Sequence, residues 1–518
     1  MVASAPRFAS ATGSARLVVF LLAFVSTAYF VHGAGANQNT RFDLVRAIVE
    51  GHSLRIDAYQ ANTMDKAIFG GHHYSDKAPG LAFAAVVPYA VLHAMDPGDP
   101  SDIEPDPAVL HLLTLATVSL VSALAGVAML GLLESLGVGL LAGAVTVVAW
   151  LLGTNAFFYG GTFVSHQFSA SLLVLGFAAL QRAGQRAERA ATGWNLAAGG
   201  LLGWAMLSEF TVAPTVALLL LYAAIRQGWR RVLLALGSCC VPMLLLGWYQ
   251  WQCFGSPLRL GYGQLASAHF RGEMGRGFFG LVAPSAQVAG ELLWGRFRGF
   301  LPLSPFLLLA VPGFVQMFRL RRRRLEALLC LLSAGSAVLV ASSYRIWNGG
   351  AALGPRHLVH ALPFLVIPVG FAVADGLRSA QRVAVAIGVA LLVASSIATV
   401  TVAVAVMPEF PEPPGLPAPL DDMAPFDGYH PFEDFALPCF LRGAMSLKAT
   451  QGGHIVLSTW VDKHDGDAFN LGEAVGLRGL SSLVPLLLFW LAAVAGFVWL
   501  LRVQRRQQTD LDDARDER

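Results

Sequence analysis

Long apolar runs, separated by short polar stretches, occupy most of the chain. A helix needs about 20 predominantly apolar residues to cross a bilayer, and many of the runs reach or approach that length. The runs cover residues 17–34, 81–95, 108–133, 136–158, 163–180, 195–225, 231–252, 300–318, 325–344, 356–375, 382–406 and 480–501. The pattern predicts an all-α polytopic membrane protein.

Arginines in the short polar stretches predict how the helices are oriented. They gather at residues 182–189, 226–231, 319–324, 378–382 and 502–506, and further arginines precede the first run. Under the positive-inside rule these stretches and both chain ends lie on the cytoplasmic side. The outer loops are then residues 35–107, 253–299, 345–355 and 407–479.

This orientation limits which runs can cross, because the arginine-rich stretches must all lie on one side. The short run 81–95, which contains Pro88, would make the number of crossings before residue 182 odd, so it is predicted not to cross. Run 195–225 must cross twice, as two short helices that meet near Pro214. The prediction is about twelve spans, and an uncleaved first helix is favoured over a cleaved signal peptide because further spans follow.

Composition agrees with the membrane assignment and excludes one class of function. Hydrophobic residues make up 55% of the chain and charged residues 13%, and the mean hydropathy is +0.58. A soluble nucleic-acid-binding protein is therefore excluded, and no nucleic-acid partner is expected. The cysteines have no metal-ligand spacing, and a Cys253–Cys439 disulfide would require an oxidising compartment.

Three regions follow from these patterns. Residues 1–406 are expected to form the transmembrane module, which includes the first outer loop, residues 35–107. Residues 407–479 begin with a proline-rich connector and form an outer loop or a small cap, and residues 480–518 form the last transmembrane helix and a cytoplasmic tail.

The first outer loop is dense in polar residues and contains the stretch GGHHYSDKAPG at 70–80. Apolar positions at helical spacing in residues 42–49 predict an amphipathic helix on the membrane surface. Because DKAPG leads directly into the run 81–95, Asp76 and Lys77 are expected at that surface. A lysine there can hold a lipid phosphate, and a carboxylate can bind a divalent metal or act as a base. A solvated loop with local ion pairs is the alternative interpretation.

Three further polar residues lie near the outer ends of apolar runs. Arg356, in GPRHLVHALP, enters the membrane at a helix end, where snorkelling is the alternative to a binding role. His166 has a similar position, and a histidine there is more often hydrogen-bonded to its neighbours than functional. Glu209, in MLSEFTVAP, favours a functional role because an unpartnered carboxylate at that depth is costly.

These residues resemble those of the GT-C membrane glycosyltransferases. The branch that contains protein O-mannosyltransferases and the lipid A aminoarabinose transferase is the most similar, and bacterial members of unassigned substrate share CFGSPLRLGY, RGFLPLSPFLLL and NLGEAVGLRGLSSLVPLL. The resemblance implies that Asp76 contacts a divalent metal ion. It also implies that Lys77, Arg356 and Arg41 lie near the phosphate of a polyprenyl carrier. His166 and Glu209 are then polar residues of the same cavity.

One departure from the family concerns the catalytic base. The family opens this loop with Asp-Glu ahead of an Arg-aromatic pair, whereas this chain has Gln38 and Asn39 ahead of Arg41 and Phe42. An amide cannot accept a proton as a carboxylate does. The candidates for the base are, in order of preference, Asp65, Asp57 and Asp43.

The resemblance implies transfer of a sugar from a polyprenyl-phosphate carrier to a glycan, lipid or protein acceptor. The reaction would take place on the outer face of a bacterial inner membrane, among membrane lipids. A transporter or lipid flippase is the alternative, but it would place charges near mid-membrane and have internal repeats, which this sequence lacks. A catalytically inactive relative is a further alternative, given the missing Asp-Glu.

Overall fold

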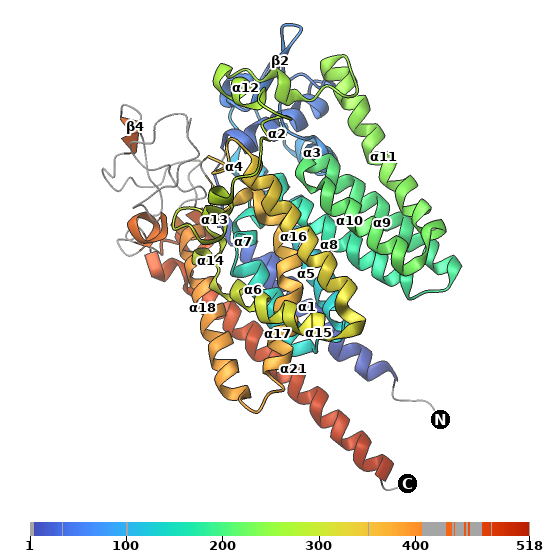
Figure 1. Ribbon diagram of the computed structural model, residues 1–518. Helices are drawn as coiled ribbons and strands as arrows, with labels where there is room; N and C mark the ends of the chain where they lie inside the picture. Colours follow the sequence, from blue (N-terminus) through green and yellow to red (C-terminus); the bar gives the residue numbers. More distant parts are fainter. Residues whose placement is uncertain are drawn as a thin grey trace.

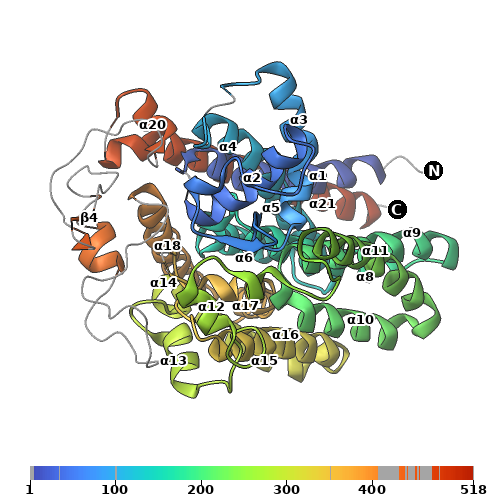
Figure 2. The same cartoon turned by 90° about the horizontal axis from the view of Figure 1, so that it is seen from above.

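The computed structural model of the chain describes residues 5–33, 35–99, 102–350, 352–406, 431–437, 440, 450–451, 454–455, 469–477 and 479–516. Long helices form a bundle, with α9, α10 and α11 on one side and α18 on the opposite side (Figures 1 and 2). The helices of the bundle are α1 (Ala5–Ala28), α4 (Pro107–Thr114), α5 (Leu120–Ser135), α6 (Leu140–Leu152), α7 (Ala156–Gly160), α8 (Ser165–Gly184), α9 (Glu188–Ser208), α10 (Ala213–Gln227), α11 (Trp229–Phe254), α15 (Ala310–Arg319), α16 (Arg324–Ser343), α17 (Leu362–Gly376), α18 (Arg382–Val406) and α21 (Val484–Asp516).

Shorter elements cover the end of the bundle that lies opposite to the two chain ends (Figure 1). They include α2 (Ala36–Val49), β2 (Lys66–Phe69), β3 (His72–Ser75), α3 (Gly80–Met95) and α12 (Ala268–Met274). Two further short helices, α13 (Ala286–Trp294) and α14 (Phe300–Leu303), lie along the side of the bundle, above α18 in Figure 1. The described residues form three small strand pairs: β1 (Phe30–Val31) with β6 (Phe469–Asn470), β2 with β3, and β4 (Thr450–Gln451) with β5 (His454–Ile455). Helix α20 (Leu471–Ala474) follows β6.

The prediction of an all-α polytopic protein is confirmed. Seven helical segments of the described residues are long and apolar enough to cross a membrane: 107–135, 210–227, 229–254, 321–343, 356–376, 382–405 and 479–503. The other predicted spans coincide with α1, α6, α8, α9 and α15. The total of twelve crossings stays a prediction.

The predicted break within run 195–225 is confirmed. Helix α9 ends at Ser208, and α10 begins at Ala213 after a short 3-10 turn, with Pro214 in its first turn, where proline is well tolerated. Helix α9 packs closely on α11 because Gly199 and Gly203 lack side chains: a Cβ at either position would collide with a carbonyl of α11, that of Ala235 or that of Cys239.

Helix α2 forms where a helix was predicted, but its polar face is not exposed. Residues 38–47 are all buried, including polar and charged side chains. Helix α3 packs against α2, and hydrogen bonds to neighbouring segments satisfy some of the polar groups; for example, Asn39 donates to the carbonyl of Asn62. The predicted exposure of a polar face over residues 42–49 is therefore wrong, because tertiary contacts cover that face, whereas the position of the helix at the membrane surface stays a prediction.

The stretch GGHHYSDKAPG forms most of a tight β-hairpin. Gly70 and Gly71 form the two-residue turn, and both have positive φ (59° and 81°), as the favoured hairpin turns require. Phe69 faces His72 at the turn, and Lys66 faces Ser75 at the open end. This register brings the residues just before β2 next to those just after β3.

Candidate active site

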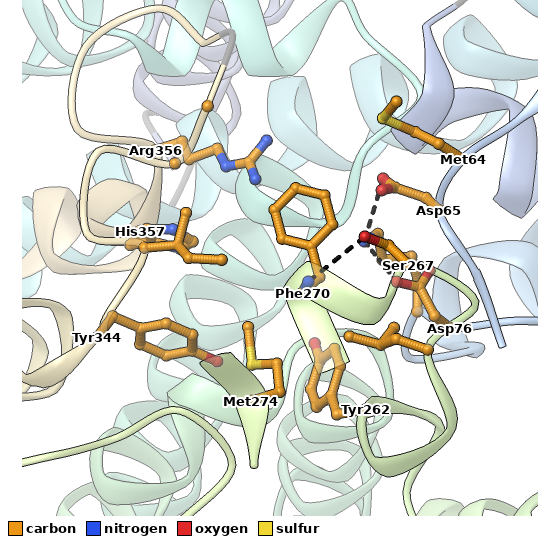
Figure 3. Close-up of a pocket in the computed structure, with 15 residues that line it drawn as sticks. Met64, Asp65, Asp76, Tyr262, Ser267, Phe270, Met274, Tyr344, Arg356 and His357 are labelled. Carbon is orange, nitrogen blue, oxygen red and sulfur yellow. Dashed lines mark hydrogen bonds and ion pairs between the residues drawn. The ribbon is translucent and has the colours of Figure 1, made fainter. Parts of the chain in front are cut away.

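A cavity of about 140 Å³ lies at the open end of this hairpin. The hairpin supplies one wall, the 344–357 segment supplies the facing wall, and α12 with the segment before it supplies the rest (Figure 3). The charged and polar residues that line the cavity are Asp65, Asp76, Lys77, Tyr262, Ser267, Tyr344, Arg356 and His357. Four of the residues that the sequence predicted, Asp65, Asp76, Lys77 and Arg356, thus meet in one place.

Lys77 joins the two carboxylates of the hairpin wall. Its Nζ lies 3.1 Å from Oδ2 of Asp65 and 3.0 Å from Oδ2 of Asp76. Burial raises the pKa of Asp65, but the nearby charges of Lys77 and Arg356 lower it further, so the net pKa lies below its ordinary value. Burial of Asp76 outweighs the effect of Lys77 and holds its pKa above the ordinary value. Asp65 is therefore the stronger acid of the two and is ionised at neutral pH.

Arg356 lies on the wall that faces these carboxylates (Figure 3). Its Nε is buried and has no hydrogen-bond partner in the described part of the chain, and the same is true of Oδ1 of Asp76. Gly349, with a φ of 75°, leaves room for this side chain, since a Cβ there would lie 2.8 Å from the arginine Nε. A ligand could satisfy both orphaned atoms if it carried an acceptor at one end and a donor at the other.

Arg298 holds the loop beside Arg356 in place. Its buried guanidinium donates to the carbonyls of Gly350, at 2.6 Å, and Ala352. Arg298 is the first residue of the stretch RGFLPLSPFLLL, and no pattern in the sequence indicated its role. Its contacts could not be read from the sequence, because both carbonyls lie more than 50 residues away along the chain.

Aromatic residues complete the cavity. Tyr344 stacks on His357 with ring centroids 5.2 Å apart, and Tyr262 lies on the side of α12. Phe270, from α12, extends into the cavity between the two charged walls (Figure 3). The motifs CFGSPLRLGY and GPRHLVHALP contain Tyr262 and His357, but no pattern in the sequence indicated Phe270.

Arg41, His166 and Glu209 form a buried network that does not line the cavity. Arg41 donates to Asn37 and, at 3.0 Å, to Oγ of Ser165, and this hydroxyl donates to Oε2 of Glu209 at 3.0 Å. Nδ1 of His166 lies 3.3 Å from the same carboxylate oxygen. The network supports the cavity from behind, since the His166 ring contacts that of His357 with centroids 6.1 Å apart.

Two other predicted residues also lie away from the cavity. Asp57 is exposed and clamps the hairpin: its Oδ2 lies 2.8 Å from Nδ1 of His72, and its Oδ1 accepts the backbone N–H of His73 at 2.7 Å. Asp43 is fully buried, accepts a hydrogen bond from Asn62 at 3.1 Å, and has an Oδ2 without a partner in the described residues. Burial raises the pKa of Asp43 to about 8.

Gln38 and Asn39, which stand where the family has Asp-Glu, have structural contacts. Oε1 of Gln38 accepts the backbone N–H of Phe163, and its Nε2 donates to the carbonyl of Gly33. Asn39 donates to the carbonyl of Asn62. Neither lines the cavity, so their amides fix α2 to the surrounding loops.

The cavity does not fit the divalent metal ion expected at Asp76. Among the described residues, no three His, Cys, Asp or Glu side chains lie close enough together to hold a metal. The two carboxylates that do approach each other, Asp65 and Asp76, both contact the ammonium of Lys77. The ammonium of Lys77 therefore occupies the position that a metal ion shared by these two carboxylates would take.

The disulfide considered between Cys253 and Cys439 involves one described residue. Cys253 is buried near the C-terminal end of α11 and forms no disulfide with another described cysteine. Cys439, like most of the 407–479 region, lies outside the described residues.

No protein-family model and no curated protein matches the sequence. Similar solved structures include ArnT from Cupriavidus metallidurans bound to undecaprenyl phosphate, at 20% identity and a TM-score of 0.48, with 76% of this chain and 64% of that chain covered. They also include the oligosaccharyltransferase AglB from Archaeoglobus fulgidus with an inhibitory peptide and a dolichol-phosphate, at 11% identity and a TM-score of 0.45, with 76% and 55% covered. Another structure of the Archaeoglobus fulgidus oligosaccharyltransferase, in complex with Zn and sulfate, has 12% identity and a TM-score of 0.41, with 75% and 53% covered.

These proteins belong to the GT-C superfamily, the one that the sequence resembles. This chain spans less than two thirds of the length of each. Because all three TM-scores are below 0.5, we interpret the site from the residues of this chain alone.

Proposed function

We propose that this protein transfers a sugar from a polyprenyl-phosphate carrier to an acceptor on the outer face of the membrane. The observation that carries the proposal is the arrangement of Asp65 and Arg356 on facing walls of one cavity. An ionised carboxylate and an unpaired guanidinium are the two groups that this transfer requires. The first can accept a proton from an attacking hydroxyl, and the second can stabilise a departing phosphate.

The aromatic lining of the cavity supports a sugar ring as the transferred group. Tyr262, Tyr344 and Phe270 offer faces against which such a ring can pack.

In the proposed reaction, Asp65 takes the proton of the acceptor hydroxyl as its oxygen attacks the anomeric carbon. The bond between that carbon and the phosphate oxygen breaks, and the polyprenyl phosphate leaves with the bonding electrons. Arg356 faces the negative charge that builds up on the phosphate. Lys77 has three N–H donors and uses two on Asp65 and Asp76, so the third remains for the phosphate.

The outward orientation of the site is also part of the proposal. The cavity lies at the end of the bundle opposite to the start of α1 and the end of α21 (Figure 1). The positive-inside rule assigns those two helix ends to the cytoplasm, which leaves the cavity on the outer side of a bacterial inner membrane. A transporter is less well supported, because the charges of the cavity lie at one end of the bundle and not halfway along it.

Single-turnover transfer by the full-length protein in nanodiscs tests the proposal. The donors are polyprenyl-phosphate monosaccharides with a radiolabelled sugar, and an envelope extract supplies acceptors. We expect Asp65→Asn to lower the rate about a hundredfold or more, because a general base typically contributes that much. Asp57→Asn is the matched control and should transfer at the wild-type rate. Full activity of Asp65→Asn would contradict the assigned base, and no transfer by the wild type from any donor would contradict the function.

A further inference from the structure

A second cavity, of about 590 Å³, lies at the end of α11 that adjoins the first outer loop. The residues that matter are His52 and Arg55, from the segment after α2, and Tyr74, Trp248 and Gln252 around them. It is separate from the candidate active site. Tyr74 packs on Phe254 with ring centroids 5.5 Å apart, and Phe254 and the backbone of Asp76 both adjoin Gly261. These groups form the wall between the two cavities.

The rim of this cavity carries Arg55, a cation that the described residues do not neutralise, and His52, whose ring can donate a hydrogen bond. His52 and Arg55 are exposed, and their side chains have no hydrogen-bond or ion-pair partner in the described part of the chain. The nearest acidic residues along the chain are engaged elsewhere. Glu50 accepts hydrogen bonds from Arg46, Tyr59 and Tyr89, while Asp57 binds the hairpin histidines. The rim therefore attracts an anion.

The flank of α11 below the cavity is apolar and unpartnered. Val241, Leu244, Trp248 and Trp251 recur at helical spacing, so they form one stripe, and all four are exposed. Arg230 lies at the opposite end of this helix. Tryptophans mark both ends of α11, Trp229 beside Arg230 and Trp251 at the other end, as expected at the two membrane interfaces. The arginine end is the cytoplasmic one under the positive-inside rule, which leaves Trp251 at the outer interface. The cationic rim is thus at the depth of lipid headgroups, directly above a surface that faces acyl chains.

We infer that this second cavity binds the headgroup of an anionic phospholipid. The lipid phosphate would lie against Arg55 and His52, the glycerol region against Trp248 and Gln252, and the acyl chains along Leu244 and Val241. A free phosphate would use only the rim, whereas a lipid uses both the rim and the stripe. Because the charged rim of the cavity and the apolar stripe of α11 adjoin each other, we identify the ligand as a lipid. This site does not depend on the proposed sugar transfer.

Native mass spectrometry of the full-length protein, released from nanodiscs of phosphatidylcholine mixed with phosphatidylglycerol, tests the inference. We expect the wild type to retain phosphatidylglycerol with about fivefold preference. An arginine near the surface contributes about 1 kcal/mol to binding an anionic lipid, which corresponds to a factor of about five, so removing Arg55 should abolish a preference of that size. The double variant His52→Asn, Arg55→Gln should lose the preference, whereas the control Arg296→Gln, an exposed arginine outside both cavities, should keep it.

Two further measurements separate the alternatives. Leu244→Ser should weaken retention of the lipid without changing the rim, and glycerol 1-phosphate should not displace the lipid. Equal retention of both lipids by the wild type would overturn the inference, as would an undiminished preference in the double variant. Displacement by glycerol 1-phosphate at low concentration would mean that the site takes a soluble anion. The altered side chains are all exposed, and unchanged thermal unfolding of the variants would exclude misfolding as the cause.

Discussion

Asp65 and Lys77 lie at the two open ends of one β-hairpin, and their side chains form an ion pair with Nζ and Oδ2 3.1 Å apart. The two residues are twelve positions apart along the chain, and the turn at Gly70 and Gly71 brings them together. The glycine pair is therefore part of the site, although it lies at the far end of the hairpin. The hairpin that includes the polar stretch 70–80 places Lys77, Asp65 and Asp76 against one cavity.

Arg356→Ala should lower the rate of sugar transfer about a hundredfold or more while the protein stays folded. The guanidinium has no ion pair in the described structure, so its removal leaves no buried charge uncompensated. It does remove a cation from the leaving phosphate, which costs several kcal/mol of transition-state stabilisation in a water-poor site. The single-turnover assay measures the rate, and Arg296→Gln is the matched control. Near-normal transfer by Arg356→Ala would make this residue an ordinary interface anchor.

The pH dependence of transfer should report on Asp65. Lys77 and Arg356 hold its pKa below the ordinary value of about 3.9, so wild-type transfer should not fall on the acid side until about pH 4. Arg356→Gln removes one of the cations that lower this pKa. The pKa of Asp65 should then rise, and the acid limb of the residual activity should move to higher pH. A wild-type limb near pH 6.5 would contradict Asp65 as the base.

Much of the fold could be predicted from the sequence, because apolar runs of membrane-spanning length specify helices with little ambiguity. The break between α9 and α10 was also predictable from run length and Pro214. The placement of α2 was not, since its apolar spacing fits a surface helix and a buried one equally well. Only the packing of α3 decides between the two.

The charged residues of the site could be identified from the sequence, but the sequence does not show which of the aspartates lies at the cavity. Asp57 and Asp65 are equivalent candidates along the chain, and only the hairpin register turns one toward the cavity and the other toward His72 and His73. Phe270 could not be predicted, because the segment around it carries no periodic pattern. The role of Arg298 could not be predicted either, since its contacts are long-range hydrogen bonds to backbone carbonyls.

A reporter fused after Met95 should lie on the outer side of the membrane. Helix α3 has 16 residues, which extend roughly 24 Å at 1.5 Å per residue, and this is less than the thickness of the hydrocarbon core. Gly80, at its start, packs tightly against Ser208, which ties α3 to the end of α9. Alkaline phosphatase activity measures exposure to the outer side, and green fluorescent protein serves as the reciprocal reporter. Fluorescence after Met95 would mean that α3 crosses, and the proposed side of the cavity would be wrong.

Asp43→Asn should stabilise the protein at pH 8 and leave its stability unchanged near pH 4. The pKa of Asp43 in the folded protein is about 8, against about 3.9 in an unfolded chain. As the pH rises from 4 to 8, the unfolded state loses its proton first, so the free energy of unfolding of the wild type falls across this range. The total loss is several kcal/mol, because each pKa unit corresponds to about 1.4 kcal/mol.

Asparagine at position 43 cannot ionise, so the variant lacks this contribution to the pH dependence, and it keeps an oxygen that can accept from Asn62. Thermal unfolding of both proteins, followed from pH 4 to pH 8, measures the difference. The unfolding temperature of the variant should exceed that of the wild type increasingly as the pH rises, while sugar transfer continues because Asp43 does not line the cavity. A wild type more stable than the variant at pH 8 would mean that Asp43 is ionised and paired. Its nearest cation, Arg46, would then have to leave Glu50, which it now contacts at 3.0 Å.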